Sequence, residues 1–296
     1  MASNIVSSLI KQHQLSPEAV AKIRELMNDS GMSFADAAVH LKLLSAEQIS
    51  GAPQPTNQAS NEDSGLVEAA IRRVSSARQV VVRQGEEVAP GEQLRVAFDA
   101  HHPRNEKMRV LRTELLLMNE PSRNANVVAL LSPDSGEGRS QLAAELAISF
   151  AQLGRRTLLV DADMRHPSQH FLFNSPTDYG LSKAISSNSK PYLHPVKGLP
   201  NMFLCTAGAV PPNPLELLSD GRFDKLLSDW RSAYEFVVID TPPVSQYADA
   251  IAIATVAGRV LLLGRTQHTS YKNTREMMRR LATTHAKIMG SVLSTF

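Results

Sequence analysis

Short apolar runs and amphipathic stretches alternate along the second half of the chain. The runs are rich in valine, leucine and isoleucine, which is typical of buried strands in a parallel sheet. They occupy residues 126–131, 157–160, 236–239, 260–263 and 288–293. Residues 141–153 and 270–282 repeat their apolar positions with the spacing of an α-helix. Strands and helices that alternate in this way predict a doubly wound, mostly parallel α/β sheet.

The beginning of the chain has a different pattern, that of a small helical bundle. Ser16, Pro17 and Glu18 form a helix cap, a proline at the first helical position and an acid in the first turn. Residues 51–58 are polar, contain prolines and have no period, as linkers do. We therefore expect a helical docking module at residues 1–50, a flexible linker at 51–103 and the α/β domain at 104–296.

A further amphipathic helix is predicted over residues 106–118. Its apolar face, which we expect to cover the sheet, contains Met108, Leu111, Leu115 and Met118. The ridge that points away from the sheet carries Glu106, Arg109 and Arg112, with Glu106 within reach of Arg109. Such a ridge is either a solvated surface or a self-complementary contact between copies of the chain.

Composition and charge narrow the possible classes of protein. The 296 residues are 43% hydrophobic and 20% charged, and the net charge of +2 gives no indication of a nucleic-acid partner. No apolar run is long enough to cross a bilayer, and the N-terminus lacks a secretory pattern. We therefore expect a cytoplasmic protein with no transmembrane segment of its own. The single Cys205 lies in an apolar run and is expected to be buried rather than reactive.

A loop with two glycines lies between a strand and a helix, which is the layout of a phosphate-binding loop. Gly136 and Gly138 let backbone amides approach a polyphosphate, and the positive end of the helix favours the anion. The match to G-x-x-x-x-G-K-[ST] is imperfect, because Ser132 replaces the first glycine and Arg139 replaces the lysine. Arginine keeps the charge but follows a moving phosphoryl group less well, which favours nucleotide binding over fast turnover. We expect the nucleotide to be bound by Ser135, Gly136, Glu137, Gly138, Arg139, Ser140 and Gln141.

Acidic residues follow two of the predicted strands at their carboxyl ends. Asp161 and Asp163 follow one strand and Asp240 ends another, and such ends face the ligand crevice of an open α/β sheet. Beside a phosphate loop, these acids hold hydrated Mg²⁺ or accept a proton, whereas the alternative for each is a capping role. We therefore expect Ser140, Asp161, Asp163 and Asp240 to hold Mg²⁺. The expected catalytic residues are Asp161, Asp163 and Arg139.

Several motifs occur in order along the predicted α/β domain. They are Glu106-x-x-Arg109-x-Leu111-Arg112-Thr113, the loop at residues 135–140, and the segments 160–167, 207–218 and 239–243. Together they resemble the cytoplasmic kinase domain of bacterial tyrosine kinases that control exopolysaccharide export and chain length. The resemblance runs from about Arg104 to the end and is greatest to the chain-length-determinant branch called EpsG. That family belongs to the P-loop ATPases related to septum-site (MinD) and partitioning (ParA) ATPases.

The resemblance implies roles for single residues and for partners. Arg139 and Ser140 would hold the phosphates of ATP and Mg²⁺, Asp161 and Asp163 would form the second Walker motif, and Asp240 the Walker B acid. Asp161 would accept the tyrosyl proton. In the family, the helix that carries Glu106, Arg109 and Arg112 mediates ring-like self-association. A membrane-embedded, Wzz-like polysaccharide co-polymerase is the usual activator, which would place this chain at the inner face of the cytoplasmic membrane.

The sequence also departs from the family pattern. Kinases of this family usually end in a tyrosine cluster, but the sequence here ends at Phe296 and its five tyrosines are scattered, so phosphorylation of such a tail is not expected. Glu145 stands where an asparagine is usual. The leading hypothesis is a protein tyrosine kinase. The alternative is a nucleotide-switched ATPase or pseudokinase that acts on the co-polymerase by binding alone, and a partitioning-type ATPase is a weaker third.

Overall fold

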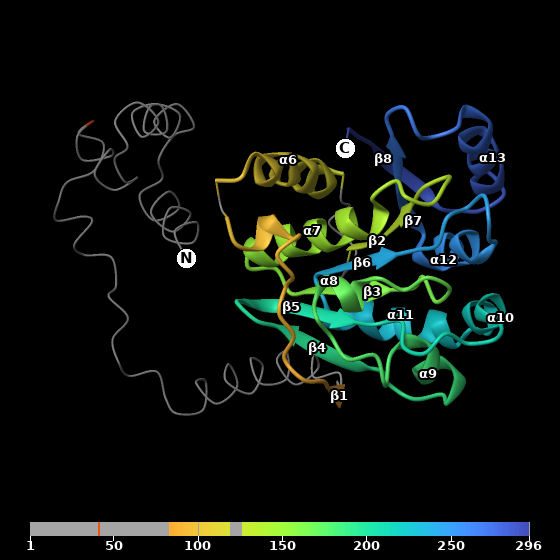
Figure 1. Ribbon diagram of the computed structural model, residues 1–296, viewed down its shortest axis with the longest axis horizontal. Helices are drawn as coiled ribbons and strands as arrows, with labels where there is room; N and C mark the ends of the chain where they lie inside the picture. The colour runs from red at the N-terminus through yellow and green to blue at the C-terminus, as the bar shows by residue number, and fades with distance from the viewer. Residues whose placement is uncertain (1–40, 42–82, 100, 119–125, 296) are drawn as a thin grey trace. The chain divides into compact units, whose positions relative to one another are not determined.

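The computed structural model describes residues 41, 83–99, 101–118 and 126–295 (Figure 1). The chain divides into two units, Met1–Arg73 and Val74–Phe296, and every element below belongs to the second. Apart from Leu41, the docking module predicted at residues 1–50 and the linker predicted as far as residue 82 lie outside the described residues.

One twisted sheet forms the centre of this unit (Figure 1). In the described part of the chain its strands are β1 (Arg83–Gln84), β2 (Asn126–Leu131), β3 (Thr157–Asp161), β4 (Tyr192–Val196), β5 (Leu199–Cys205), β6 (Phe236–Asp240), β7 (Arg259–Arg265) and β8 (Lys287–Ser294). They lie in the order β1-β4-β5-β3-β6-β2-β7-β8. The strands from β5 to β8 in this order are parallel, and β4 runs antiparallel to β5. The predicted mostly parallel α/β sheet is confirmed.

Helices cover both faces of the sheet. The described helices are η1 (Arg95–Ala97), α6 (Pro103–Leu117), α7 (Arg139–Gln152), α8 (Gln169–Leu172), α9 (Leu181–Ser186), α10 (Pro214–Ser219), α11 (Arg222–Ala233), α12 (Asp249–Ala257) and α13 (Tyr271–Leu281). Side chains alternate along a strand, so Val127 and Leu131 of β2 face the core beneath α11 and α12, whereas Val128 and Leu130 face α7. This double burial explains why the central strands read as continuous apolar runs.

The predicted linker extends too far toward the C-terminus. Residues 83–99 pack on the domain, where the side chains of Val88, Leu94 and Val96 are buried. The amide of Gln152 in α7 donates a hydrogen bond to the Val96 carbonyl at 2.8 Å. These apolar residues are widely spaced among polar ones and follow no helix or strand period, so the sequence pattern did not reveal them.

The predicted helix at residues 106–118 forms as α6, but it packs mainly on α7, which itself covers the sheet (Figure 1). Met108 and Leu115 are buried as expected, whereas Met118 follows the last helical residue and remains 43% exposed. The expectation that Arg112 points outward is wrong. Its guanidinium donates to the Ser149 carbonyl of α7 at 2.7 Å.

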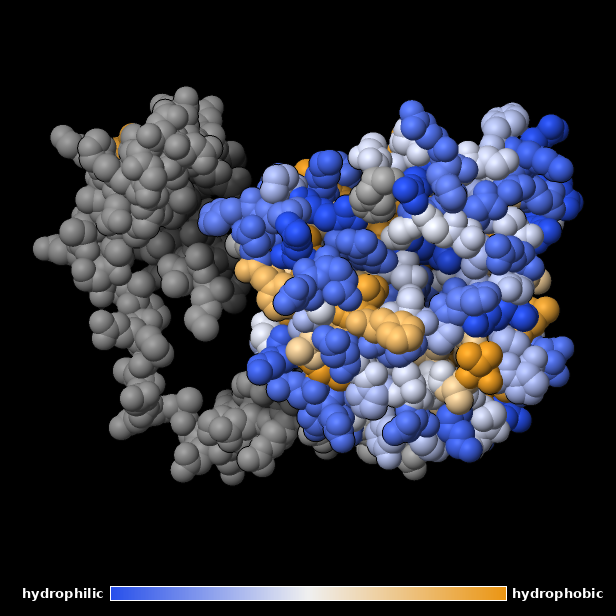
Figure 2. Space-filling view, in the orientation of Figure 1, coloured by the Kyte–Doolittle hydropathy of each residue, from blue (hydrophilic) through white to orange (hydrophobic). Residues whose placement is uncertain are grey.

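The face of the unit drawn in Figure 2 is mostly polar. Figure 2 shows a mainly hydrophilic face, on which apolar residues occur in small groups between polar ones. Within the described residues, none of the helices combines the length and the hydrophobicity needed to span a bilayer. Cys205 is fully buried, and burial raises the pKa of its thiol, which agrees with the predicted unreactive role.

Candidate active site

The glycine loop connects β2 to α7, as the sequence predicted. Gly136 and Gly138 have φ angles of +73° and +87°, in the left-handed region that favours glycine. Gly138 is also the N-cap of α7, so the loop leads directly into the first turn of that helix. Free backbone amides and the helix dipole therefore meet at this point, as an anion site requires.

The Arg139 side chain is 8% exposed and lies within the loop. Its guanidinium donates hydrogen bonds to the Ser132 hydroxyl and to the Thr241 carbonyl. The nearest carboxylate oxygens are those of Asp240 at 3.8 Å and Asp163 at 3.9 Å. Arg139 thus joins the loop to the ends of β3 and β6, and it supplies positive charge among buried acids.

The segment between β7 and α13 holds the glycine loop from the other side. Glu137 is buried, and its carboxylate accepts hydrogen bonds from the Thr269 hydroxyl and from the backbone N–H of Asp134 at 3.0 Å. The Asn273 amide donates to Asp134 Oδ1 at 2.7 Å. Glu137 is among the residues expected from the sequence to bind the nucleotide, but its carboxylate forms hydrogen bonds within the protein. The partners are more than 130 positions apart in sequence, so no local pattern could reveal them.

Asp161 and Asp163 lie together at the carboxyl end of β3, and both are buried. Asp161 Oδ2 accepts the backbone N–H groups of Ser168 and Gln169, each at 3.0 Å. Asp163 Oδ1 accepts the backbone N–H of His166 at 2.9 Å. Burial raises the pKa of the Asp161 carboxyl well above its usual range, and the negative charge of Asp240 adds to this effect.

Asp240 ends β6 beside Asp161 in the β3–β6 register, and it is fully buried. The side-chain amide of Gln169 donates to Asp240 Oδ2 at 2.8 Å and to the Ser140 carbonyl at 2.9 Å. Burial raises the pKa of the Asp240 carboxyl, and the positive charge of Arg139 opposes this rise. Gln169 was not predicted as a site residue, although it connects the loop to the acid.

The side-chain oxygen atoms at this edge of the sheet differ in whether they are available to coordinate Mg²⁺. Asp240 Oδ1 is buried and has no hydrogen-bond partner among the described residues, which suits a ligand of a hard cation. Ser140 is only partly buried and opens α7 next to it. These two residues fit Mg²⁺, which commonly keeps water and phosphate oxygens as further ligands. Asp161 and Asp163 accept hydrogen bonds from backbone N–H groups, and their role as ligands stays a prediction.

Arg165 was noted only as part of a motif, but it has well-defined contacts. Its guanidinium binds the buried carboxylate of Asp249 through two hydrogen bonds, of 2.7 and 3.1 Å. The same guanidinium lies 4.3 Å from the ring centre of Tyr247. A bidentate pair of this kind anchors the segment after β3 to α12.

Gln141 and Glu145 lie on consecutive turns of α7. Gln141 Nε2 donates to Glu145 Oε1 at 3.1 Å, and Arg104 of α6 forms an ion pair with Glu145 Oε2. Glu145 is fully buried. The residue that departs from the family pattern therefore connects α6 to the helix that begins at the phosphate loop.

Of the three residues expected at a contact between copies, Glu106 and Arg109 form an exposed ion pair at 3.2 Å, whereas Arg112 binds α7. Their role in self-association stays a prediction.

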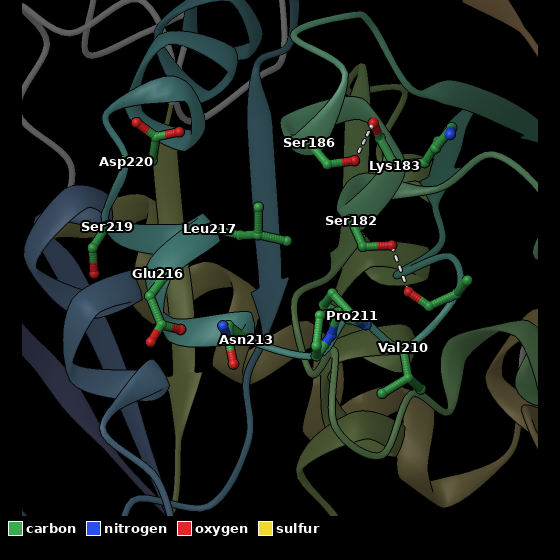
Figure 3. Close-up of a pocket in the computed structure, with 12 residues that line it drawn as sticks. Ser182, Lys183, Ser186, Val210, Pro211, Asn213, Glu216, Leu217, Ser219 and Asp220 are labelled. Carbon is green, nitrogen blue, oxygen red and sulfur yellow. Dashed lines mark hydrogen bonds between the residues drawn. The ribbon is translucent and has the colours of Figure 1, made fainter.

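Among the cavities lined by described residues, two open near this edge. The larger, of about 820 Å³, lies between α9, α10 and the loop after β5, and Figure 3 shows Leu217 of α10 opposite Ser182 of α9. Ser182 Oγ donates to the Ala209 carbonyl at 2.7 Å, which fixes one wall. The residues that line this cavity include none of the predicted site residues. The smaller cavity, of about 140 Å³, reaches the glycine loop at Gly138.

A comparison with models of protein families finds no match. Among curated proteins, the chain is 32% identical to tyrosine-protein kinase YwqD of Bacillus subtilis, over 64% of this chain and 80% of that relative. The kinase domain of Escherichia coli tyrosine kinase ETK has a TM-score of 0.64 and 28% identity, over 68% of this chain and 79% of that one. The chain belongs to the bacterial tyrosine-protein kinases.

Membership of this kinase family confirms the resemblance stated from the motifs, and the P-loop ATPase fold agrees with it. The septum site-determining protein MinD from Pyrococcus horikoshii is 17% identical, with a TM-score of 0.50, over 57% of this chain and 70% of that one. This likeness shows a shared fold alone. Assignment to the branch called EpsG stays a prediction, as do the roles of the single site residues.

Proposed function

We propose that the chain is an ATP- and Mg²⁺-dependent protein tyrosine kinase that regulates exopolysaccharide polymerisation, chain length and export. This proposal rests on one observation, that several groups needed for phosphoryl transfer meet at one edge of the sheet. A phosphate loop, the cation of Arg139 and the buried acids Asp161, Asp163 and Asp240 meet there in a member of the tyrosine-kinase family. Phosphoryl transfer needs mainly positioning and charge stabilisation, which these groups offer.

Each residue has a distinct part in the proposed reaction. The amides at Gly136 and Gly138 bind phosphate oxygens, and Ser140 with Asp240 would hold Mg²⁺. When bound, this ion would neutralise charge on the phosphate oxygens. Asp161 accepts the proton of the acceptor tyrosine, because a carboxylate whose pKa is raised holds a proton more firmly near neutral pH.

The test of this function measures two products separately. The purified chain is incubated with Mg²⁺ and γ-labelled ATP, and phosphotyrosine and free phosphate are each quantified. We expect phosphotyrosine from the parent chain. We expect none from Asp161→Ala or from the isosteric Asp161→Asn, with ATP binding largely kept. Asp178→Ala, at an exposed acid, serves as the matched control. Unchanged phosphotyrosine in both Asp161 variants would refute the assignment of Asp161.

A second candidate function is a nucleotide-switched regulator that transfers no phosphate to tyrosine. The observation that favours it is the position of Arg139, whose guanidinium is bound to Ser132 and Thr241 within the protein. Arg139→Lys would release this contact and supply the usual lysine, so this hypothesis expects a higher rate of ATP turnover. It also expects that a variant unable to bind nucleotide loses polysaccharide control, whereas a transfer-dead variant keeps it.

We also propose where the chain acts. A Wzz-like, membrane-embedded polysaccharide co-polymerase would be its activator at the inner face of the cytoplasmic membrane, and residues 1–50 would be a docking module. The exposed pair Glu106 and Arg109 supports homo-oligomerisation. Addition of the cytoplasmic tail of the co-polymerase to the labelling assay should raise phosphotyrosine. No effect on either phosphotyrosine or phosphate release would contradict this partner.

A further inference from the structure

The five tyrosines of the chain all lie in the described part, and their exposure differs widely. Tyr234 is 2% exposed and Tyr192 is 38% exposed, whereas Tyr271 is 82% exposed. Tyr179 and Tyr247 are partly buried. A phosphoryl acceptor has to bring its hydroxyl into line with the γ-phosphate, so this difference in exposure separates the possible acceptors.

The rings of two tyrosines are fixed by contacts with neighbouring side chains. Tyr234 packs edge-on against Phe203, and burial raises the pKa of its phenol to about 12. The Tyr247 ring lies beneath the Arg165 guanidinium, which is itself bound to the buried Asp249. Neither side chain can leave its site without breaking contacts in the interior.

Two further tyrosines lie against one another at the β4 edge. The rings of Tyr179 and Tyr192 are 5.1 Å apart, and the Tyr179 hydroxyl is hydrogen-bonded to Ser189 at 3.1 Å. The backbone of Tyr192 pairs with Arg83 of β1 and donates to the Tyr179 carbonyl. A strand residue that is fixed in this way cannot enter another active site unless the sheet opens.

Tyr271 has none of these restraints. It is the first residue of α13, and its side chain makes no hydrogen bond or ring contact with the described residues. The cap in front of it is weak, because the bond from the Asn273 N–H to Ser270 Oγ measures 3.5 Å. Because the Tyr271 side chain is already exposed, its hydroxyl can reach another copy of the chain while Asn273 keeps its contact with the glycine loop.

The surroundings of Tyr271 also favour the charged product. Lys272 and Arg275 are exposed on the same first turns of α13. Glu276 is paired with Arg279 and Arg280, which reduces its repulsion of an added anion. A phosphotyrosine carries nearly two negative charges, and it would lie at the positive end of the helix beside these cations.

We propose that Tyr271 is an acceptor of the chain's own kinase activity. This inference rests on the proposed tyrosine kinase function. The phenolic oxygen forms a bond to the γ-phosphorus of ATP while the bond from that phosphorus to the β,γ-bridging oxygen breaks. ADP leaves with the electron pair, and the phenolic proton passes to Asp161 of the catalysing copy.

The experiment labels the purified full chain with γ-labelled ATP and Mg²⁺, and it maps the label by peptide mass spectrometry. A glutamate–tyrosine copolymer is offered in parallel as an external acceptor. We expect the label on the peptide that contains Tyr271. Tyr271→Phe should lose most of the chain's own label and still phosphorylate the copolymer. The control Tyr192→Phe, at the next most exposed tyrosine, should keep both activities, and unfolding midpoints should be unchanged in both variants.

Three results would overturn the inference, and they differ in what they say about the kinase. Label on another tyrosine, with Tyr271→Phe labelled like the parent, overturns the site and leaves the kinase proposal intact. A parent chain that phosphorylates the copolymer but never itself also overturns the site and leaves the kinase proposal intact. A chain that labels neither acceptor overturns the proposed kinase function, and the inference with it.

Discussion

Asp240 has one carboxylate oxygen, Oδ1, that is buried without a hydrogen-bond donor among the described residues, while its other oxygen accepts the Gln169 amide at 2.8 Å. If Oδ1 serves Mg²⁺, Asp240→Asn should remove a charged ligand while its amide oxygen can still accept from Gln169. We expect the Mg²⁺ concentration needed for half-maximal ATP binding to rise by at least on the order of tenfold. Titration of a fluorescent ATP analogue at several Mg²⁺ concentrations measures this. An unchanged Mg²⁺ dependence, equal to that of the surface control Asp178→Asn, would remove Asp240 from the metal site.

Because of Tyr234, we expect the folded protein to lose stability in alkaline solution. Burial raises the pKa of its phenol from 10 to about 12, so the unfolded chain releases this proton at a lower pH than the folded chain does. The unfolded state therefore gains stability between these values, and the free energy of unfolding falls as the pH rises. Tyr234→Phe has no such proton. Relative to this variant, the parent should lose roughly 3 kcal/mol at most across the window, as measured by urea unfolding at pH 10 and pH 12. A difference that is independent of pH would show that the phenol is solvated.

The candidate site could be predicted from sequence only in part, and single residues show why. Asp161, Asp163 and Asp240 are marked by their place at the ends of apolar strands, which is a local signal. The partners of Arg139 and Glu137 are different, because Thr241 and Thr269 lie more than 100 positions away in sequence. Such pairs form only when the β2, β6 and β7 ends meet in the folded sheet, so their side chains could not be assigned in advance.

Among the strands, those with a local apolar signal could be predicted from sequence, whereas those that depend on distant contacts could not. Central strands such as β2 and β6 are buried on both faces, and their unbroken apolar runs were predicted nearly to the residue. In β4, His194 and Pro195 interrupt the pattern, and the strand is antiparallel to β5 at the side of the sheet. Within the described part of the chain, β1 comprises only Arg83 and Gln84, and it pairs there with β4 alone. Edge elements of this kind depend on contacts made elsewhere in the chain and leave little periodic signal.

A buried ion pair contributes to the contact between α6 and α7. Glu145 is fully buried, and Arg104, whose side chain is 21% exposed, is its cationic partner. Arg104→Met would leave a buried carboxylate without its cation and should lower the free energy of unfolding by about 3 kcal/mol. Glu145→Gln in the same chain should recover much of this loss, because the remaining group is neutral and keeps an acceptor for Gln141.

Denaturant unfolding of the parent, both single variants and the double variant completes a mutant cycle for this pair. A surface ion pair, Arg155 with Glu235, offers the matched control, because both of its side chains are at least 40% exposed. Removal of the control pair should cost less than about 1 kcal/mol. Equal effects at the two pairs would mean that water reaches Glu145 in solution.

Across the whole molecule, the phosphate loop is supported by parts of the chain that are far apart in sequence. The Arg265 guanidinium donates to the Gly136 carbonyl at 2.9 Å, and His268 Nε2 lies 3.0 Å from the Ser135 carbonyl. Arg104 and Glu145 connect the same region to α6. A change at α6 or at the start of α13 therefore has a direct structural route to the nucleotide site. Through these contacts, the proposed self-association would act on the nucleotide site.

The proposed self-association through α6 yields a prediction that separates two arginines of the same helix. Arg109 lies on the exposed ridge with Glu106, whereas the Arg112 guanidinium binds the Ser149 carbonyl of α7. Arg109→Ala should therefore weaken self-association and leave unfolding within about 0.5 kcal/mol of the parent. Arg112→Ala should lower the free energy of unfolding by about 1 kcal/mol through the lost hydrogen bond.

Sedimentation velocity over a range of concentrations measures the first effect, and denaturant unfolding measures the second. Arg279→Ala, at an exposed arginine of α13 that is also paired with a glutamate on its own helix, is the control for both measurements. If Arg109→Ala associates like the parent and like this control, the ridge is only a solvated surface. In that case any contact between copies would have to use a different face of the domain, because Arg112 is hydrogen-bonded to α7.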